Sequence, residues 1–300
     1  MGKVAIITDS TAFVSPNLIE GLPVHIVPLH INWNGHNYED GIDIHPPEFF
    51  ERLKIEKELP KTSQITTQEF VSLYKKLLDQ GYEILSIHIS SKISGTFNAA
   101  YQAIKELATN KINLVDSLTG AAAMAFMVLH SARAAVNGAS LKECTEIAEN
   151  VRQNSDIYFV PGSLEFLYRG GRIGGAASFL GSVLQIKPIL KTREGIIDAV
   201  ERVRTMGRAM QRVIELVSQE VGDSKYIEIA GLYADIPELA EKLVENARNY
   251  LGIDRVVNTF ISTISPALGT YIGTGSVGLA FTYSDHHPNS KIYELPEKTP

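Results

Sequence analysis

The residues with the clearest capacity for chemistry lie in the stretch Ile89–Phe97, which reads ISSKISGTF. Three serines, a glycine and a threonine stand here between an apolar run, Glu83–Ile89, and a helix-like run, Asn98–Leu107. The free N–H groups of a first helical turn point outward, and the helix dipole favours an anion there. The stretch therefore predicts a site for a negatively charged oxygen. The alternative is that Ser94 only caps its own helix.

Acidic side chains follow two further predicted strands. Asp9 follows the apolar run Val4–Ile7, and Asp116 follows Ile112–Val115. Ligands of parallel α/β sheets bind beyond the carboxyl ends of the strands, so we expect these groups at the same edge as the serines. Both aspartates have oxygens suited to a metal ion, but capping and turn roles are commoner for such residues. The sequence has no His-Glu-x-x-His motif and one cysteine, so we expect no metal site and no cofactor.

Two other catalytic motifs are incomplete. If Ser94 were the serine of a G-x-S-x-G nucleophile motif, Lys92 and Thr96 would stand where the motif requires its two glycines. No sequence feature identifies a general base for such a serine. The segment Gly273–Gly278 matches G-x-G-x-x-G, but a β-branched run follows it and too little chain remains for a βαβ unit. The sequence therefore argues against both a serine hydrolase and a dinucleotide-binding enzyme.

Arginines concentrate in one part of a chain whose net charge is −6. They form either a solvated face or a docking surface for an acidic partner or a phosphate group. The cluster consists of Arg169, Arg172, Arg193, Arg202, Arg204, Arg208 and Arg212.

Composition limits the class of protein. The chain has 300 residues, 44% hydrophobic and 21% charged, as in a soluble globular protein. The acidic net charge argues against a nucleic-acid-binding protein, which usually has a basic patch or stripe. The single cysteine, Cys144, fits a reducing compartment and a packing role on a helix face. Neither a signal peptide nor an apolar run of about 20 residues is present, so we expect a cytoplasmic protein without integral membrane association.

The order of predicted elements divides the chain in two. Strands and helices alternate in residues 1–155, which predicts a mostly parallel α/β domain. Within it we expect one strand over Val24–Ile31, with Pro28 at an edge or bulge, and a polar loop over Leu59–Thr67. Residues 156–284 predict a second, α+β domain that contains a hairpin, and residues 285–300 a loose tail.

Several of these motifs occur together, in this order, in the DegV family, and the chain resembles that family over roughly residues 4 to 283. The resemblance implies a bacterial fatty-acid-binding protein with an N-terminal α/β domain, a C-terminal α/β domain with a six-stranded antiparallel sheet, and an acyl tunnel between them. It further implies a non-enzymatic carrier that presents the fatty acid to a kinase partner, whose ATP converts the carboxylate to an acyl phosphate for phospholipid synthesis. We expect a monomer. The motifs are TDST, TSQ at Thr62–Gln64, SSKISGT, LEFLYRGGRIGG, KPIL and PALGTYIGTGSVGLAF.

The resemblance also assigns residues. Thr62 and Ser94 would hold the carboxylate, and Tyr271 stands where the family usually has a histidine. Tyr271 can donate a hydrogen bond but does not supply the charge of a histidine. The resemblance also implies that the head group of the fatty acid contacts Ser63, Gly95, Thr96 and Arg172. It further implies a kinase-docking face that includes Arg169, Arg202 and Arg204.

The chemistry of a fatty acid fits these residue types. Each buried CH₂ contributes about 0.8 kcal/mol, so fourteen methylenes give roughly 11 kcal/mol before ordering costs. The head group then sets orientation, and hydroxyls with helix-start amides satisfy a carboxylate without a lysine. Ala176–Gly181, Met124 and Met127 are either tunnel walls or ordinary core. The alternative function is an enzyme that acts on a small acylated or phosphorylated substrate at the same strand ends.

Overall fold

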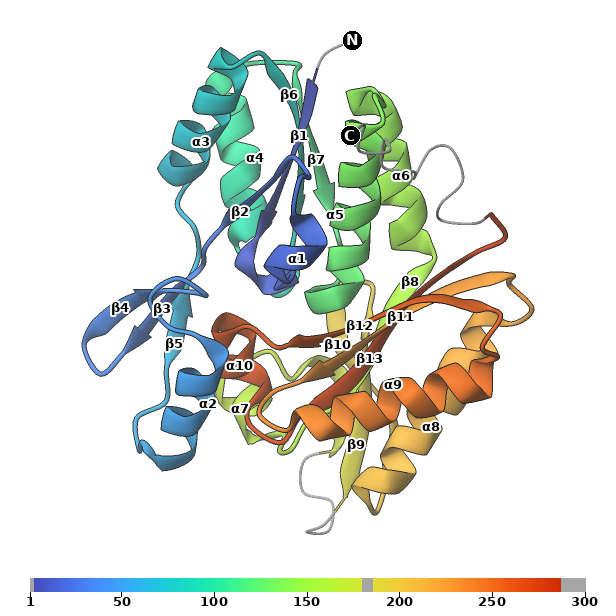
Figure 1. The fold of residues 1–300 in the computed structure, drawn as a ribbon. Helices are drawn as coiled ribbons and strands as arrows, with labels where there is room; N and C mark the ends of the chain where they lie inside the picture. Colours follow the sequence, from blue (N-terminus) through green and yellow to red (C-terminus); the bar gives the residue numbers. More distant parts are fainter. Residues whose placement is uncertain (1–2, 180–185, 287–300) are drawn as a thin grey trace.

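The computed structural model describes residues 3–179 and 186–286, which form a mixed α/β structure with three sheets (Figure 1). The first sheet is parallel, with the strand order β2-β1-β6-β7. This confirms the parallel sheet predicted from the alternation of strands and helices. Its strands are β1 (Lys3–Asp9), β2 (Val24–Val27), β6 (Tyr82–His88) and β7 (Ile112–Asp116).

Two pairs of helices cover this sheet, one pair on each face (Figure 1). Helix α5 is almost wholly buried because it lies between the parallel sheet and the sheet of the second half. Cys144 is buried on α6, and burial raises the pKa of its thiol to about 11, consistent with a packing role. The helices are α3 (Thr67–Asp79) and α4 (Thr96–Leu107) on one face, and α5 (Ala121–Val136) and α6 (Leu141–Gln153) on the other.

A small antiparallel sheet interrupts the alternation and corrects two expectations. Val24–Ile31 is not one strand: β2 ends at Val27, and β3 (His30–Trp33) belongs to the small sheet. Pro28 has no N–H for a ladder hydrogen bond, so the parallel pairing stops there. The supposed loop Leu59–Thr67 contains β5 (Lys61–Ser63), which places Thr62 in a strand. The remaining elements here are η1 (Ser10–Ala12), α1 (Pro16–Ile19), β4 (His36–Glu39) and α2 (Pro46–Ile55).

The second half forms a six-stranded sheet in the order β10-β9-β8-β13-β11-β12. All neighbouring strands are antiparallel except β11 and β12, which are parallel, so the expected antiparallel sheet is correct apart from this pair. The predicted hairpin joins β9 to β10 through Glu194 and Gly195, both at positive φ. The strands are β8 (Ser155–Val160), β9 (Lys187–Arg193), β10 (Ile196–Val203), β11 (Tyr226–Tyr233), β12 (Val256–Thr263) and β13 (Val277–Ser284).

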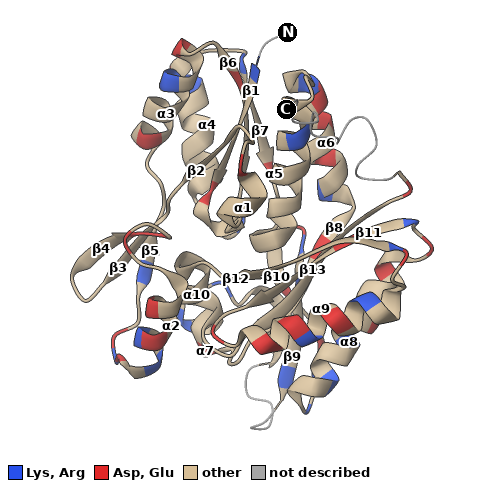
Figure 2. Cartoon of the chain, viewed as in Figure 1, with Lys and Arg blue, Asp and Glu red and all other residues tan. Residues whose placement is uncertain are grey.

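Helices α8 and α9 cover one face of this sheet, and α5 packs against the other. Basic and acidic residues are frequent on the outer helices α9 and α2 (Figure 2). Among the described helices, none has both the length and the apolar character to cross a membrane. The helical elements of this half are α7 (Glu165–Arg169), η2 (Gly174–Phe179), α8 (Met206–Val221), α9 (Pro237–Leu251) and α10 (Pro266–Ile272).

The largest hydrophobic core joins the two halves of the chain. Leu232, Ala267 and Ala280 from the second half belong to the same buried cluster as β1, β6 and α5. A second cluster fills the space between the six-stranded sheet and helices α8 and α9. Of the predicted loose tail, residues 287–300 lie outside the described residues.

Candidate functional site

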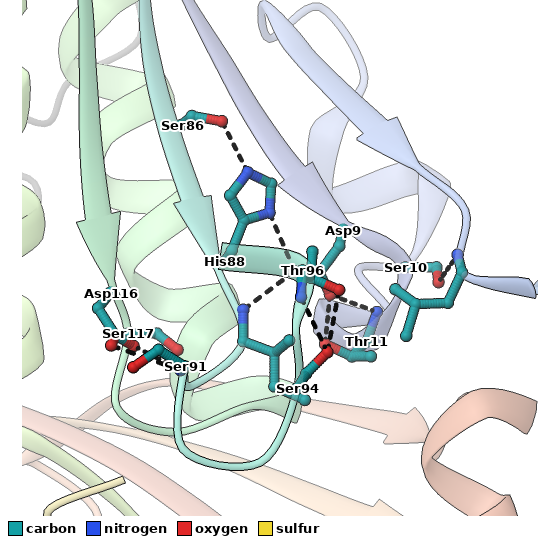
Figure 3. A network of polar contacts seen from close by, with 12 residues as sticks. Asp9, Ser10, Thr11, Ser86, His88, Ser91, Ser94, Thr96, Asp116 and Ser117 are labelled. Atoms are coloured by element: carbon teal, nitrogen blue, oxygen red, sulfur yellow. Dashed lines mark hydrogen bonds and ion pairs between the residues drawn. The ribbon is translucent and has the colours of Figure 1, made fainter. Parts of the chain in front are cut away.

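Polar groups from the carboxyl ends of β1, β6 and β7 meet at one edge of the parallel sheet, as predicted (Figure 3). The Asp9 carboxylate is fully buried and accepts hydrogen bonds from the backbone N–H groups of Thr11 (3.1 Å) and Ile89 (3.0 Å). Asp116 accepts from the backbone N–H groups of Ser91 (3.2 Å) and Leu118 (3.0 Å). Both aspartates therefore act as turn and loop anchors.

Ser86, His88 and Asp9 form a chain of hydrogen bonds that resembles a catalytic triad in its connectivity (Figure 3). Ser86 Oγ lies 2.7 Å from His88 Nε2, and His88 Nδ1 lies 3.0 Å from Asp9 Oδ2. All three side chains are fully buried, and the Tyr74 hydroxyl, 2.8 Å from Ser86 Oγ, closes the serine end. No substrate can reach this serine, so the chain of bonds holds the sheet together.

The serine loop leads directly into α4. The helix begins at Thr96 with Gly95 as its N-cap, so the alternative in which Ser94 is the cap is wrong by one residue. Ser94 Oγ still accepts the backbone N–H of Thr96 (3.2 Å) and lies 3.0 Å from Thr96 Oγ1. A side chain at Gly95 would collide with the carboxamide of Gln64, which follows β5. The loop therefore presents a half-buried hydroxyl beside the first turn of a helix, next to the end of β5.

Thr62 and Tyr271 come together from distant parts of the chain. The Tyr271 hydroxyl on α10 lies 2.6 Å from Thr62 Oγ1 on β5, and both residues are half-buried. Successive side chains of a strand point to opposite faces. Ser63 accordingly points away from this pair, is exposed, and accepts a hydrogen bond from Asn32. Of the two candidate hydroxyls on β5, only Thr62 meets Tyr271.

Arg172 connects the tyrosine to the serine loop. Its Nε donates to the carbonyl oxygen of Ile93 (3.2 Å), and its guanidinium carbon lies 4.7 Å from the centre of the Tyr271 ring. Its Nη1 also donates to the carbonyl oxygen of Gly170 (2.7 Å). A Cβ on Gly170 would lie 2.3 Å from the Tyr271 ring, so the chain needs glycine there. Arg172 thereby fixes both sides of the polar site.

An apolar cavity adjoins this polar site. It contains about 560 Å³ not filled by protein atoms, including space open to solvent. Ile93, which precedes Ser94, and Ile272, which follows Tyr271, both line it. The remaining lining residues come from both halves of the chain: Ile89, Gly120, Ala121, Ile157, Phe159, Thr192, Ile197, Leu232, Ile264, Leu268, Ser276, Val277 and Gly278.

The described residues that the sequence offered as tunnel walls are absent from the lining of the apolar cavity. Met124 and Met127 are fully buried in the main core rather than at the described cavity wall. Ala176 packs in a small separate cluster with Leu167 and Leu190, and residues 180 and 181 of Ala176–Gly181 lie outside the described residues. The ordinary-core alternative is therefore correct for the two methionines and for Ala176.

A polar groove lies on the other side of the Thr62–Tyr271 pair. It contains about 1090 Å³ not filled by protein atoms, including space open to solvent, and its lining includes four basic residues and Glu58. Arg202 and Arg204 do not join its described lining: Arg202 lies over the Phe179 ring at 4.7 Å, and Arg204 is exposed. The four basic residues are Lys57, Lys61, Arg169 and Arg172.

Sequence reasoning missed residues that position the site. Leu268 lines the cavity and Gln64 packs on Gly95. Asp40, a buried carboxylate, contacts the start of α10. Its position before Gly41 in a turn-rich segment is typical of an ordinary turn residue, and no local pattern points to α10.

Comparisons with known proteins agree with one another. A family model described as "Uncharacterised protein, DegV family" matches residues 3–284. A DegV domain-containing protein of Clostridium perfringens is 35% identical over 283 residues, which cover 93% of this chain and 98% of that protein. A DegV family protein of Thermus thermophilus, described by its fatty acid binding, has a TM-score of 0.88 at 29% identity, covering 94% of this chain and 99% of that one. DegV of Bacillus subtilis, described as a fatty acid binding protein, has a TM-score of 0.83 at 30% identity, covering 95% and 100% of the two chains. With this family match over nearly its whole length and a fold shared with solved members, the chain belongs to the DegV family.

Proposed function

We propose that this protein binds a long-chain fatty acid, with the acyl chain in the apolar cavity and the carboxylate at Thr62, Ser94 and Tyr271. One observation carries the proposal. Two of the three hydroxyl residues are direct neighbours in sequence of cavity-lining isoleucines, Ile93 and Ile272. An amphiphile with one apolar end and one anionic end matches this junction, and the solved relatives named above are described as fatty acid binding.

The two parts of the site serve the two ends of the ligand. Burial of about fourteen methylenes gives roughly 11 kcal/mol before ordering costs, so the cavity supplies the affinity. Hydroxyl donors at Thr62, Ser94 and Tyr271, with Thr96 and the first amides of α4 near Ser94, then fix the carboxylate. Ser63 is not part of this set because it lies on the opposite face of β5.

We further propose that the polar groove is where a kinase partner reaches the carboxylate to form an acyl phosphate. Lys57, Lys61 and Arg169 supply positive charge beside the Thr62–Tyr271 pair, as an incoming phosphate or an acidic partner surface requires. In this proposal the protein is a monomeric cytoplasmic carrier of two domains, residues 1–155 and 156–284, and contributes binding rather than catalysis. Arg202 and Arg204, outside the groove lining, are assigned to a wider docking face.

The test of binding uses protein purified from bacteria. Extraction and mass spectrometry should find about one acyl chain per molecule, and the emptied protein should bind a fluorescent fatty acid. A double variant, Thr62→Ala with Ser94→Ala, should bind more weakly while its unfolding temperature changes little. The matched control is Ser63→Ala, which should bind as the unaltered protein does. Empty protein that also fails to bind the probe would remove the carrier function.

A further inference from the structure

Asp40 is the buried carboxylate nearest the start of α10, and the fold of the first half places it there. It follows β4 and is 2% exposed. Its backbone N–H donates to the carbonyl oxygen of Leu29 (2.9 Å), which fixes the position of the residue. A carboxylate at this depth requires hydrogen-bond donors, because an unpaired buried charge is strongly unfavourable.

Those donors come from two separate elements. Ser10 of η1 donates its hydroxyl to Asp40 Oδ2 (2.6 Å), and the backbone N–H of Ala267, in the first turn of α10, donates to Oδ1 (3.2 Å). Ser265, the N-cap of α10, accepts the backbone N–H of Leu268 (3.2 Å), so the start of the helix is capped beside Asp40. Asp40 therefore joins the first half of the chain to the start of a helix that belongs to the second half.

That helix forms one side of the binding site. Tyr271, near its end, meets Thr62, and Leu268 and Ile272 line the cavity. Its middle rests on α2, where a Cβ on Gly269 would lie within 3 Å of the Phe49 and Phe50 rings. A helix of seven residues gains little stability by itself, so contacts at its two ends and its middle determine where it sits.

We propose that Asp40 is a positioning residue for ligand binding, which holds α10 so that Tyr271 and the cavity wall face the fatty acid. The inference rests on the proposed function for its ligand. Asp40 does not itself touch the cavity or the hydroxyl pair in the described lining.

Burial and, to a smaller extent, the charge of Asp9 at the end of β1 raise the Asp40 pKa to about 6, while the hydrogen bonds from Ser10 and Ala267 oppose the rise. Neither η1 nor α10 carries a basic or acidic side chain, and the other ionisable residues on its own segment are Glu39 and Asp43. Exposure of Asp40 to water on opening of α10 would return its pKa toward the ordinary range, so protonation of Asp40 favours the closed position of α10.

The test compares Asp40→Asn with the unaltered protein in binding of a fluorescent fatty acid. At pH 7.5 the variant should bind about tenfold more weakly. Combining Asp40→Asn with Tyr271→Phe should weaken binding by less than the product of the two single effects, since both act through the same hydroxyl pair. Independent effects that multiply would overturn the proposal.

A matched control separates positioning from general stability. Ser262 also joins the two halves, because its hydroxyl donates to the carbonyl oxygen of Phe13 (2.9 Å), but it does not contact α10. Ser262→Ala should leave affinity unchanged; an equal loss in both variants would overturn the proposal. If Asp40→Asn does not fold, amide hydrogen exchange of the unaltered protein decides: opening of α10 exposes Asp40 and lowers its pKa, so α10 should open more readily at pH 7.5 than at 5.5 relative to α9. That measurement needs no ligand, so it also stands apart from a failure of fatty-acid binding.

Discussion

Tyr271 and Thr62 are 209 positions apart in the chain, yet their hydroxyl oxygens lie 2.6 Å from each other. Each hydroxyl satisfies the other, at a junction between an apolar cavity and a polar groove. Under the proposed function, a carboxylate at this junction would replace one hydroxyl partner for the other and would gain two donors that already lie together. The position of both hydroxyls before the ligand arrives would lower the entropy cost of binding.

Tyr271→Phe should weaken fatty-acid binding about fivefold. The ring and its contact with Arg172 remain, and only one hydrogen bond is lost, worth about 1 kcal/mol. Titration with a fluorescent fatty acid measures the change. Tyr168→Phe, on an exposed tyrosine, is the control. Equal affinity in the two variants would show that the Tyr271 hydroxyl does not hold the ligand.

Gly170→Ala should weaken binding without straining the backbone. Gly170 has an ordinary helical φ of −77°, so alanine is tolerated by the chain, but its Cβ would lie 2.3 Å from the Tyr271 ring. The ring must move, and the bond to Thr62 is lost with it. Gly207→Ala, which meets no atom within 4 Å, is the matched control. A crystal structure of the Gly170 variant with an unmoved ring would contradict this account.

Arg172→Lys should cost more than Arg169→Lys. Arg172 donates to two backbone carbonyl oxygens through different nitrogens and covers the Tyr271 ring, and a lysine cannot reproduce that planar arrangement. Arg169 is exposed and pairs with Glu165 one turn away (3.2 Å), an interaction worth about 0.5 kcal/mol or less. Thermal unfolding and fatty-acid titration of both variants test the difference, which should appear in both measurements for Arg172 alone.

Leu232→Phe should shift the bound lipid toward shorter chains. Leu232 is 3% exposed, belongs to the core on the cavity side of the sheet and lines the cavity, so the larger phenyl side chain takes up space proposed for the acyl chain. Each methylene excluded costs about 0.8 kcal/mol of affinity, so longer acids lose most. Mass spectrometry of lipids that co-purify with the two proteins gives the chain-length profile. An unchanged profile with an intact fold would place the acyl chain elsewhere.

Stability should depend on pH through Asp40. Its pKa in the folded protein is raised to about 6 from the ordinary value of 3.8, mainly by burial. Between these values the folded protein holds more protons than the unfolded chain, so the contribution of Asp40 to the free energy of unfolding falls as pH rises. The loss amounts to about 3 kcal/mol across the window. Urea unfolding from pH 4 to 7 should show the stability of Asp40→Asn rising relative to the unaltered protein, and a constant difference would contradict the assignment.

The sequence predicts elements whose apolar residues recur with a regular spacing. It does not predict elements that form only because they pair with distant strands. Helices α8 and α9 have such a period, because their apolar spacing and flanking residues are local signals in the sequence. Strand β5 was not predicted, because three polar residues at a sheet edge have no apolar pattern. The break at Pro28 was predicted as an irregularity, but its consequence, a change of sheet, depends on where β3 finds its partners.

The candidate site was predictable only in part for the same reason. The convergence of Asp9, Asp116 and the serine loop follows from the rule for parallel strand ends. The pairing of Thr62 with Tyr271 does not, because no periodicity links β5 to α10, and only the resemblance suggested it. The methionines of α5 were placed in the core because that helix is enclosed by two sheets, a fact of tertiary packing.

The position of β13 has a consequence for synthesis on the ribosome. It is the last strand of the described residues, but it lies between β8 and β11 inside the six-stranded sheet, and α10 comes just before it. A nascent chain that lacks residues 266–284 has a gap in this sheet, no Tyr271, and no wall from Leu268, Ile272 or Val277. Under the proposed function, the binding site therefore closes only after residues 266–284 have left the exit tunnel, and translation products that lack them should not hold lipid.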